Sequence, residues 1–234
     1  APAQVEVEDR ADGGYILRSP LPLGTYAGTT TEYLLRWAME APDRTFLADR
    51  LDPADEWTRI SYANALTGAR NIGQALLDRG PTADRPAMII SDNGWHNGLL
   101  HLGAMLVGIP VVPVSPAYSL MSQDCGKLKF VAELMTPGLV FAEDGSAFAK
   151  ALAAVDFGDA EIVVARNLEA IEGATAFDSL RETEATPAVD DAAARVGPDT
   201  VAKILFTSGS TGMPKGVINT QRMICSNQKA LALL

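Results

Sequence analysis

Residues 87–114, AMIISDNGWHNGLLHLGAMLVGIPVVPV, carry the pattern from which the fold class follows. Two apolar runs, at 87–91 and 109–114, enclose a segment whose apolar residues recur at helical spacing. The residues of that stripe are Trp95, Leu99, Leu102 and Leu106. Apart from the serine that ends the first, both runs are apolar rather than alternating, which is typical of strands covered on both faces. The stretch therefore predicts a strand, a helix and a second strand of a parallel sheet.

The same succession of strands and helices continues towards both ends of the chain. Towards the C-terminus, the pattern predicts a helix over 122–135, a strand over 139–142, a helix over 147–155 and a strand over 161–165. Towards the N-terminus, it predicts a helix over 31–40, strands over 45–49 and 57–60, and a helix that begins after Ser61. We therefore expect an α/β fold with a layered, mostly parallel β-sheet flanked by helices.

Changes in composition divide the chain into four regions. We expect an extended N-terminal arm over 1–29, an α/β subdomain over 30–180, a linker or surface loop over 181–199, and a hairpin with the start of a helix over 200–234. The chain has no initiator methionine and stops inside a helical pattern, so we expect it to be the front part of a longer polypeptide. Such a piece exposes apolar surface and a sheet edge, which favours self-association.

Composition and charge argue against some classes of binding partner and favour one kind of cellular compartment. The 19 Lys and Arg residues against 29 Asp and Glu residues give a net charge of −10. Without a large basic cluster, a nucleic-acid partner is not expected. Cys125 and Cys225 lie far apart, which suits a reducing compartment. No apolar run reaches the roughly 20 residues that a membrane-spanning helix needs, so we predict a cytoplasmic protein without a membrane partner.

Residues 207–216, TSGSTGMPKG, carry the strongest chemical signal. Nine of these ten residues are hydroxylated, glycine, proline or lysine. Glycines let backbone N–H groups approach a ligand closely, hydroxyls add donors, and Lys215 adds a positive charge. This composition fits a loop that holds the β- and γ-phosphates of a nucleotide. The spacing differs from the common P-loop, and the chain contains neither GxGxxG nor GxSxG.

The strand–loop–strand segment ILFTSGSTGMPKGVI, at 204–218, resembles the phosphate-binding signature of the adenylate-forming superfamily. That superfamily includes acyl- and aryl-CoA synthetases, luciferases and peptide-synthetase adenylation domains. The segments WTRISYANAL at 57–66 and LGAMLVGIPVVPVSP at 102–116 resemble other elements of the same family. The resemblance therefore extends from about residue 30 onward, and it implies that the chain is the front portion of the large N-terminal domain.

Three further segments resemble feruloyl-CoA synthases, which join 4-hydroxycinnamic acids to coenzyme A. They are GGYILRSPLPLGTYAG at 13–28, SPAYSLMSQDCGKLKF at 115–130 and VINTQRMICSNQKAL at 217–231. This resemblance implies ferulate or a related phenylpropenoic or aromatic acid as the substrate. Many relatives carry Thr-His after the lysine loop, whereas this chain has Thr220-Gln221, so a histidine has no counterpart here.

The resemblance implies an AMP-forming acid–CoA ligase that uses ATP, Mg²⁺ and coenzyme A. A small-molecule carboxylic acid attacks the α-phosphate of ATP, pyrophosphate leaves, and the thiol of coenzyme A then opens the acyl-adenylate. Lys215 is the implied catalytic residue, because it stabilises the charge that develops on pyrophosphate. The residues implied to bind the phosphates are Thr207, Ser208, Gly209, Ser210, Thr211, Gly212 and Lys215.

The family's adenine, ribose, metal and acyl contacts are expected beyond residue 234, so no metal ligand is assigned in this chain and the chain alone is expected to be inactive. Alternative readings are a fatty acyl-CoA ligase, a peptide-synthetase adenylation domain, or a non-catalytic nucleotide-binding module.

Two histidines, His96 and His101, are too few for a zinc site and are interpreted as packing residues. Lys203 is interpreted as the end of a surface strand.

Overall fold

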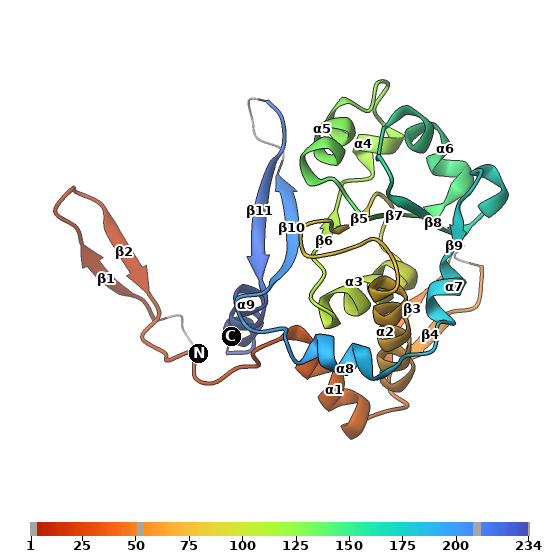
Figure 1. The fold of residues 1–234 in the computed structure, drawn as a ribbon. Helices are drawn as coiled ribbons and strands as arrows, with labels where there is room; N and C mark the ends of the chain where they lie inside the picture. The colour runs from red at the N-terminus through yellow and green to blue at the C-terminus, as the bar shows by residue number, and fades with distance from the viewer. Residues whose placement is uncertain (1–3, 51–53, 208–211, 234) are drawn as a thin grey trace.

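A seven-stranded sheet is the centre of the computed structural model, which describes residues 4–50, 54–207 and 212–233 (Figure 1). The strand order is β11-β10-β6-β5-β7-β8-β9, and every neighbouring pair is parallel except β10–β11. The strands are β5 (Ala87–Ile89), β6 (Val111–Pro113), β7 (Leu139–Asp144), β8 (Glu161–Arg166), β9 (Thr175–Ala176), β10 (Val201–Thr207) and β11 (Lys215–Thr220). The predicted α/β architecture with a mostly parallel sheet is confirmed.

Helices cover both faces of the sheet and create two hydrophobic cores. Alternate residues of β5 belong to different cores: Ala87 and Ile89 join one, and Met88 joins the other together with Ile90, which follows the strand. All four are fully buried, which explains why this run is apolar throughout. The helices of the first core are α2 (Tyr62–Leu77) and α3 (Trp95–Leu106), and those of the second are α5 (Gly126–Met135) and α6 (Gly145–Ala154).

Two glycines allow α2 and α3 to pack closely. A Cβ atom added to Gly103 of α3 would lie 2.7 Å from Cγ2 of Ile72. A Cβ atom added to Gly73 of α2 would lie 2.9 Å from Cγ1 of Val107. Both distances are below ordinary van der Waals contact, so a larger residue at either position would push the helices apart.

Helix α2 begins at the residue that the sequence indicates. The hydroxyl oxygen of Ser61 accepts a hydrogen bond from the backbone N–H of Asn64 at 3.2 Å, as an N-cap does. We expect Ser61→Ala to lower the free energy of unfolding by about 1 kcal/mol, because that N–H loses its partner. Urea unfolding measures the change, and Ser61→Thr is the matched control because it keeps the hydroxyl. Equal stability of the alanine variant and the wild type would contradict this role.

The segment over 181–199, expected to be a linker or surface loop, instead contains α8 (Pro187–Ala193). Thr186 caps this helix, Pro187 occupies its first turn, and Val189 and Ala192 are buried in the first core. The polar composition concealed the helix, because only these two residues of α8 are buried, with Ala193 partly buried beside them.

The N-terminal arm over 1–29 departs from the extended conformation that the sequence predicts. The N-terminal arm contains a hairpin that stands apart from the main sheet (Figure 1). Its strands are β1 (Glu6–Asp9) and β2 (Tyr15–Arg18). The remaining elements are α1 (Thr30–Glu40), β3 (Thr45–Asp49), β4 (Thr58–Ser61), α4 (Ala117–Leu120), η1 (Leu168–Ala170), α7 (Phe177–Arg181) and α9 (Gln221–Leu231). Of the helices in the described residues, none has both the length and the apolar character needed to cross a membrane.

Candidate functional site

The predicted phosphate loop connects β10 and β11, which pair as an antiparallel hairpin with one shift of register, between Val201 and Lys203. Thr207 and Lys215 form the last residue pair before the loop. The hydroxyl of Thr207 also donates to the carbonyl oxygen of Lys215 at 3.4 Å. These contacts bring two of the predicted site residues together at the loop's mouth. Gly212 is described and exposed, whereas the predicted residues 208–211 (Ser208, Gly209, Ser210 and Thr211) lie outside the described residues.

Packing anchors the stem of this hairpin. The pairing of β10 with β6 is confined to Lys203 and Val111, so the ladder holds only the base of the hairpin. Beyond that point, Ile204 and Phe206 pack against the second core. Gly216 lies opposite Phe206, and a Cβ atom there would lie 3.4 Å from Cζ of the ring and still closer to Ile204. The glycine therefore leaves room for the ring that secures the stem.

Lys215 offers an available positive charge next to the loop. Its side chain is exposed, and no carboxylate in the described part of the chain lies within 4.0 Å of its ammonium group. Pro214, directly before it, is buried, which fixes the point where the chain re-enters the stem. An exposed ammonium group and a hydroxyl on a firmly held stem are suited to binding an anion.

A polar cluster that the sequence analysis missed lies at the carboxyl ends of β7 and β8. Nδ1 of His96 lies 2.9 Å from Oε1 of Glu143, and Nε of Arg166 lies 3.6 Å from the same oxygen. The ring of His96 also stacks on Trp95 and meets the edge of Phe177. The predicted packing role of His96 is therefore confirmed, but its acidic partner was not foreseen. The available signal was the charged residue that ends each apolar run, LVFAED and EIVVAR.

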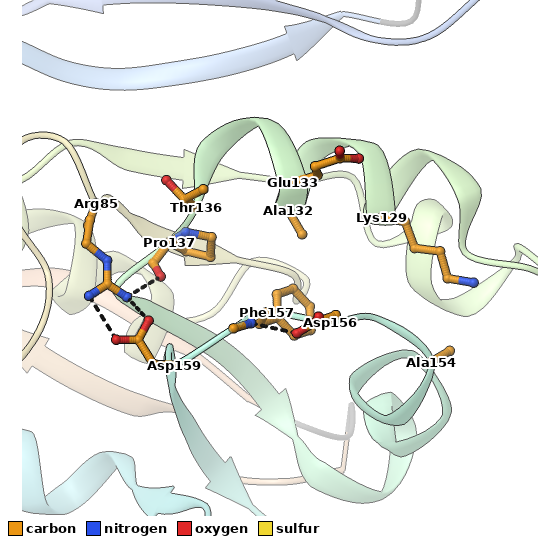
Figure 2. A pocket seen from close by; sticks show the side chains of 11 residues that line it. Arg85, Lys129, Ala132, Glu133, Thr136, Pro137, Ala154, Asp156, Phe157 and Asp159 are labelled. Atoms are coloured by element: carbon orange, nitrogen blue, oxygen red, sulfur yellow. Dashed lines mark hydrogen bonds and ion pairs between the residues drawn. The ribbon is translucent and has the colours of Figure 1, made fainter.

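A cavity of about 650 Å³ lies at the opposite, amino-terminal edge of the sheet (Figure 2). The guanidinium group of Arg85 pairs with Asp159 and donates to the carbonyl oxygen of Pro137 at 3.3 Å, as the dashed lines in Figure 2 show. Its charge is thus already compensated. In open parallel sheets, ligands bind at the carboxyl ends of the strands. This cavity therefore lacks the position of a phosphate site, although a second basic residue, Lys129, also lines it.

Within the residues that the structure describes, neither the cysteines nor the metal-ligating residue types form a second reactive centre. Cys125 and Cys225 are both free and buried, and burial raises the pKa of the Cys225 thiol. A raised pKa keeps the thiol protonated and unreactive at neutral pH. Among the described residues, no three His, Cys, Asp or Glu side chains are placed to hold a metal ion.

Comparison with known proteins identifies relatives of this chain. A family model described as "AMP-binding enzyme" matches residues 34–233. A sulfoacetate–CoA ligase from Cupriavidus necator is 29% identical over 194 residues, which cover 81% of this chain and 34% of the relative. A second ligase, from Rhodococcus jostii, is named for joining a methyl-dioxo-octahydro-indenyl propanoyl group to CoA. It is 27% identical over 213 residues, which cover 83% of this chain and 38% of the relative.

A solved structure shares the fold at low sequence identity. It is the adenylation domain of a keto acid-selecting NRPS module bound to a keto acyl adenylate, with a TM-score of 0.68 and 20% identity. The match covers 92% of this chain and 36% of that one. This chain thus spans about a third of the length of each of these three proteins. None of the three is named as a feruloyl-CoA synthase.

Proposed function

This chain belongs to the AMP-binding enzyme family, and we propose that it is the ATP-phosphate-binding part of an AMP-forming acid–CoA ligase. The observation that carries the proposal is the hairpin stem, which holds Thr207 and the exposed Lys215 together at the mouth of a glycine- and hydroxyl-rich loop. Because the chain spans about a third of its relatives, the whole reaction is proposed for a polypeptide of the relatives' length.

The proposed reaction has two displacement steps. A carboxylate oxygen of the acid forms a bond to the α-phosphorus of ATP, and the bond from that phosphorus to the bridging oxygen breaks, which releases pyrophosphate. The thiolate of coenzyme A then attacks the acyl carbonyl carbon, and AMP leaves. Mg²⁺, when bound with ATP, neutralises phosphate charge. We assign no residue of this chain to the metal or to coenzyme A.

Residues of the loop are proposed to stabilise the leaving pyrophosphate. Backbone N–H groups and hydroxyls donate to the β- and γ-phosphate oxygens, and the Lys215 ammonium group compensates the charge that grows there as the bond breaks. The loop residues proposed to donate are Thr207, Ser208, Gly209, Ser210, Thr211 and Gly212. Donors held in place before the reaction lower the barrier more than donors that must reorganise.

For the acid, we propose ferulate or a related phenylpropenoic or aromatic acid. The support is the resemblance of the segments at 13–28, 115–130 and 217–231 to feruloyl-CoA synthases. The two curated relatives are named for sulfoacetate and for a ring-bearing propanoyl group, so members of this family accept chemically different acids. A panel of acids is therefore the appropriate test of this part of the proposal.

The test is ATP–pyrophosphate exchange by a polypeptide extended to the relatives' length, with cinnamic, benzoic and fatty acids supplied in turn. We expect exchange to be fastest with hydroxycinnamic acids and a CoA thioester to form from the same acids. Exchange without thioester formation would instead identify an adenylation domain, and fastest exchange with fatty acids would identify a fatty acyl-CoA ligase. Absence of exchange with every acid, despite ATP binding, would indicate a non-catalytic nucleotide-binding module. The 234-residue chain alone is expected to show no exchange.

A further inference from the structure

A second cavity, of about 380 Å³, lies between α1, α3, β10 and α9. Its wall is largely aromatic and aliphatic, formed by Leu34, Trp37, Phe46, Tyr62 and Met105. The ring of Tyr62 stacks on two other aromatic rings. Its centroid lies 5.9 Å from that of Trp37 and 4.7 Å from that of Phe46. Apolar cavities of this size with a few polar groups are typical of small-molecule sites.

His101 supplies a hydrogen-bond acceptor to this cavity. Nδ1 of its ring lies 3.1 Å from the carbonyl oxygen of Asn97, which assigns the ring proton to Nδ1 and leaves Nε2 with a free electron pair. Burial lowers the pKa of His101, and the nearby charge of Lys203 lowers it further, against the opposing effect of the Asn97 hydrogen bond. The ring is therefore neutral near pH 7 and presents an acceptor.

Lys203 supplies a positive charge that has no counterion among the residues the structure describes. It lines the cavity from β10 and is half-buried. Across the described ranges, no carboxylate lies within 4.0 Å of its ammonium group. A partly desolvated ammonium group beside apolar rings is complementary to an anion that itself carries an apolar body. The sequence analysis interprets Lys203 as the end of a surface strand, and this interpretation does not account for its place in the cavity lining.

Hydrogen bonds between elements that are distant in sequence hold the cavity walls in place. The backbone N–H and the hydroxyl of Thr30 both donate to Oε1 of Gln221, at 2.9 and 3.0 Å. Gln221 is fully buried, so these bonds fasten α1 to the start of α9. The hydroxyl of Thr30 also lies 3.9 Å from Sδ of Met105 on α3. When the walls of a cavity are fixed before binding, less conformational entropy is lost as the ligand binds.

We propose that this cavity binds a small planar aromatic carboxylate that also carries a hydroxyl group. The ring packs against Trp37 and Tyr62, the carboxylate pairs with the Lys203 ammonium group, and the hydroxyl donates to Nε2 of His101. The site is separate from the described part of the phosphate loop, because its lining includes neither Thr207 nor any residue of 212–216, and Lys203 lies about 13 Å along the strand from Thr207. The proposal concerns binding alone and does not rest on the proposed ligase activity.

The test is titration calorimetry of the 234-residue chain at pH 7.5 with 4-hydroxybenzoate, benzoate and phenol. These probes separate the ring, the carboxylate and the hydroxyl. We expect 4-hydroxybenzoate to bind most tightly, and benzoate and phenol to bind about tenfold more weakly, since each loses one polar contact. Lys203→Gln should weaken binding of both carboxylates about tenfold and leave phenol unchanged. His101→Phe should reduce the affinity for 4-hydroxybenzoate to that for benzoate.

Two further variants locate the site. Lys150→Gln changes an exposed lysine on α6 that is not part of the cavity lining, and it should leave all affinities unchanged. Lys215→Gln should also leave them unchanged, whereas loss of binding in that variant would place the ligand at the loop and overturn the proposal. Equal affinity of the wild type for 4-hydroxybenzoate and phenol, or no saturable binding, would overturn it as well. The probe series on the wild type decides the question even if Lys203→Gln does not fold.

Discussion

Replacing Lys215 with alanine is expected to slow ATP–pyrophosphate exchange by roughly 5- to 150-fold in a polypeptide of the relatives' length. This factor corresponds to about 1–3 kcal/mol of lost transition-state stabilisation from one charge-assisted contact. The charge on pyrophosphate grows as the bond to the α-phosphorus breaks, so the loss should fall mainly on kcat. The measurement is steady-state exchange at varied ATP concentration.

The position of Lys215 makes this effect separable from a loss of stability. Its side chain is exposed and forms no ion pair with a described carboxylate, so alanine should leave the free energy of unfolding nearly unchanged. Lys150→Ala, at an exposed position of α6, is the matched control and should exchange at the wild-type rate. A Lys215→Ala enzyme with unchanged kcat would remove the lysine from the proposed mechanism.

Replacing Phe141 with alanine is expected to lower the free energy of unfolding by about 3–5 kcal/mol. Phe141 lies in β7, is fully buried, and has its ring centroid 5.3 Å from that of Phe177. The substitution removes buried apolar surface and leaves a cavity that the surrounding core fills only in part. Because domains are stable by only about 5–15 kcal/mol, this is a large fraction of the total.

Urea unfolding followed by circular dichroism measures this loss. The matched control is Leu134→Ala on α5, whose side chain is 57% exposed and should cost less than about 0.5 kcal/mol. If Phe141→Ala cost no more than the control, Phe141 would not be a core residue in solution. If the variant does not fold, Phe141→Leu provides a smaller change at the same position.

The parallel sheet was predictable because its strands are covered on both faces. The run at 87–91 is apolar at every position except its final serine, and its residues alternate between two cores, so no polar residue is tolerated within the strand. The hidden helix α8 was not predictable by the same reasoning. A helix that buries only Val189 and Ala192 has too few apolar positions to show a stripe.

Local composition also explains which parts of the candidate site were found. The loop at 207–216 is continuous in sequence, so its glycines, hydroxyls and lysine are visible together. The aromatic cavity is not continuous, because His101 and Lys203 come from α3 and β10. They approach each other through the parallel pairing of β10 with β6, where Lys203 lies opposite Val111. Sequence patterns report such tertiary neighbours only after the strand order is known.

The bond between Thr30 and Gln221 has a consequence for how the chain folds during synthesis. The two residues are separated by 191 positions, so α1 leaves the ribosome long before its partner is made. At translation rates of about 5–20 residues per second, the delay is on the order of 10–40 s. During that interval, α1 lacks the helix that fastens it and exposes part of its apolar side. Since α1 also packs on α2 and α3, which are made soon after it, its bond to Gln221 is a late addition to a helix that already has a place in the fold.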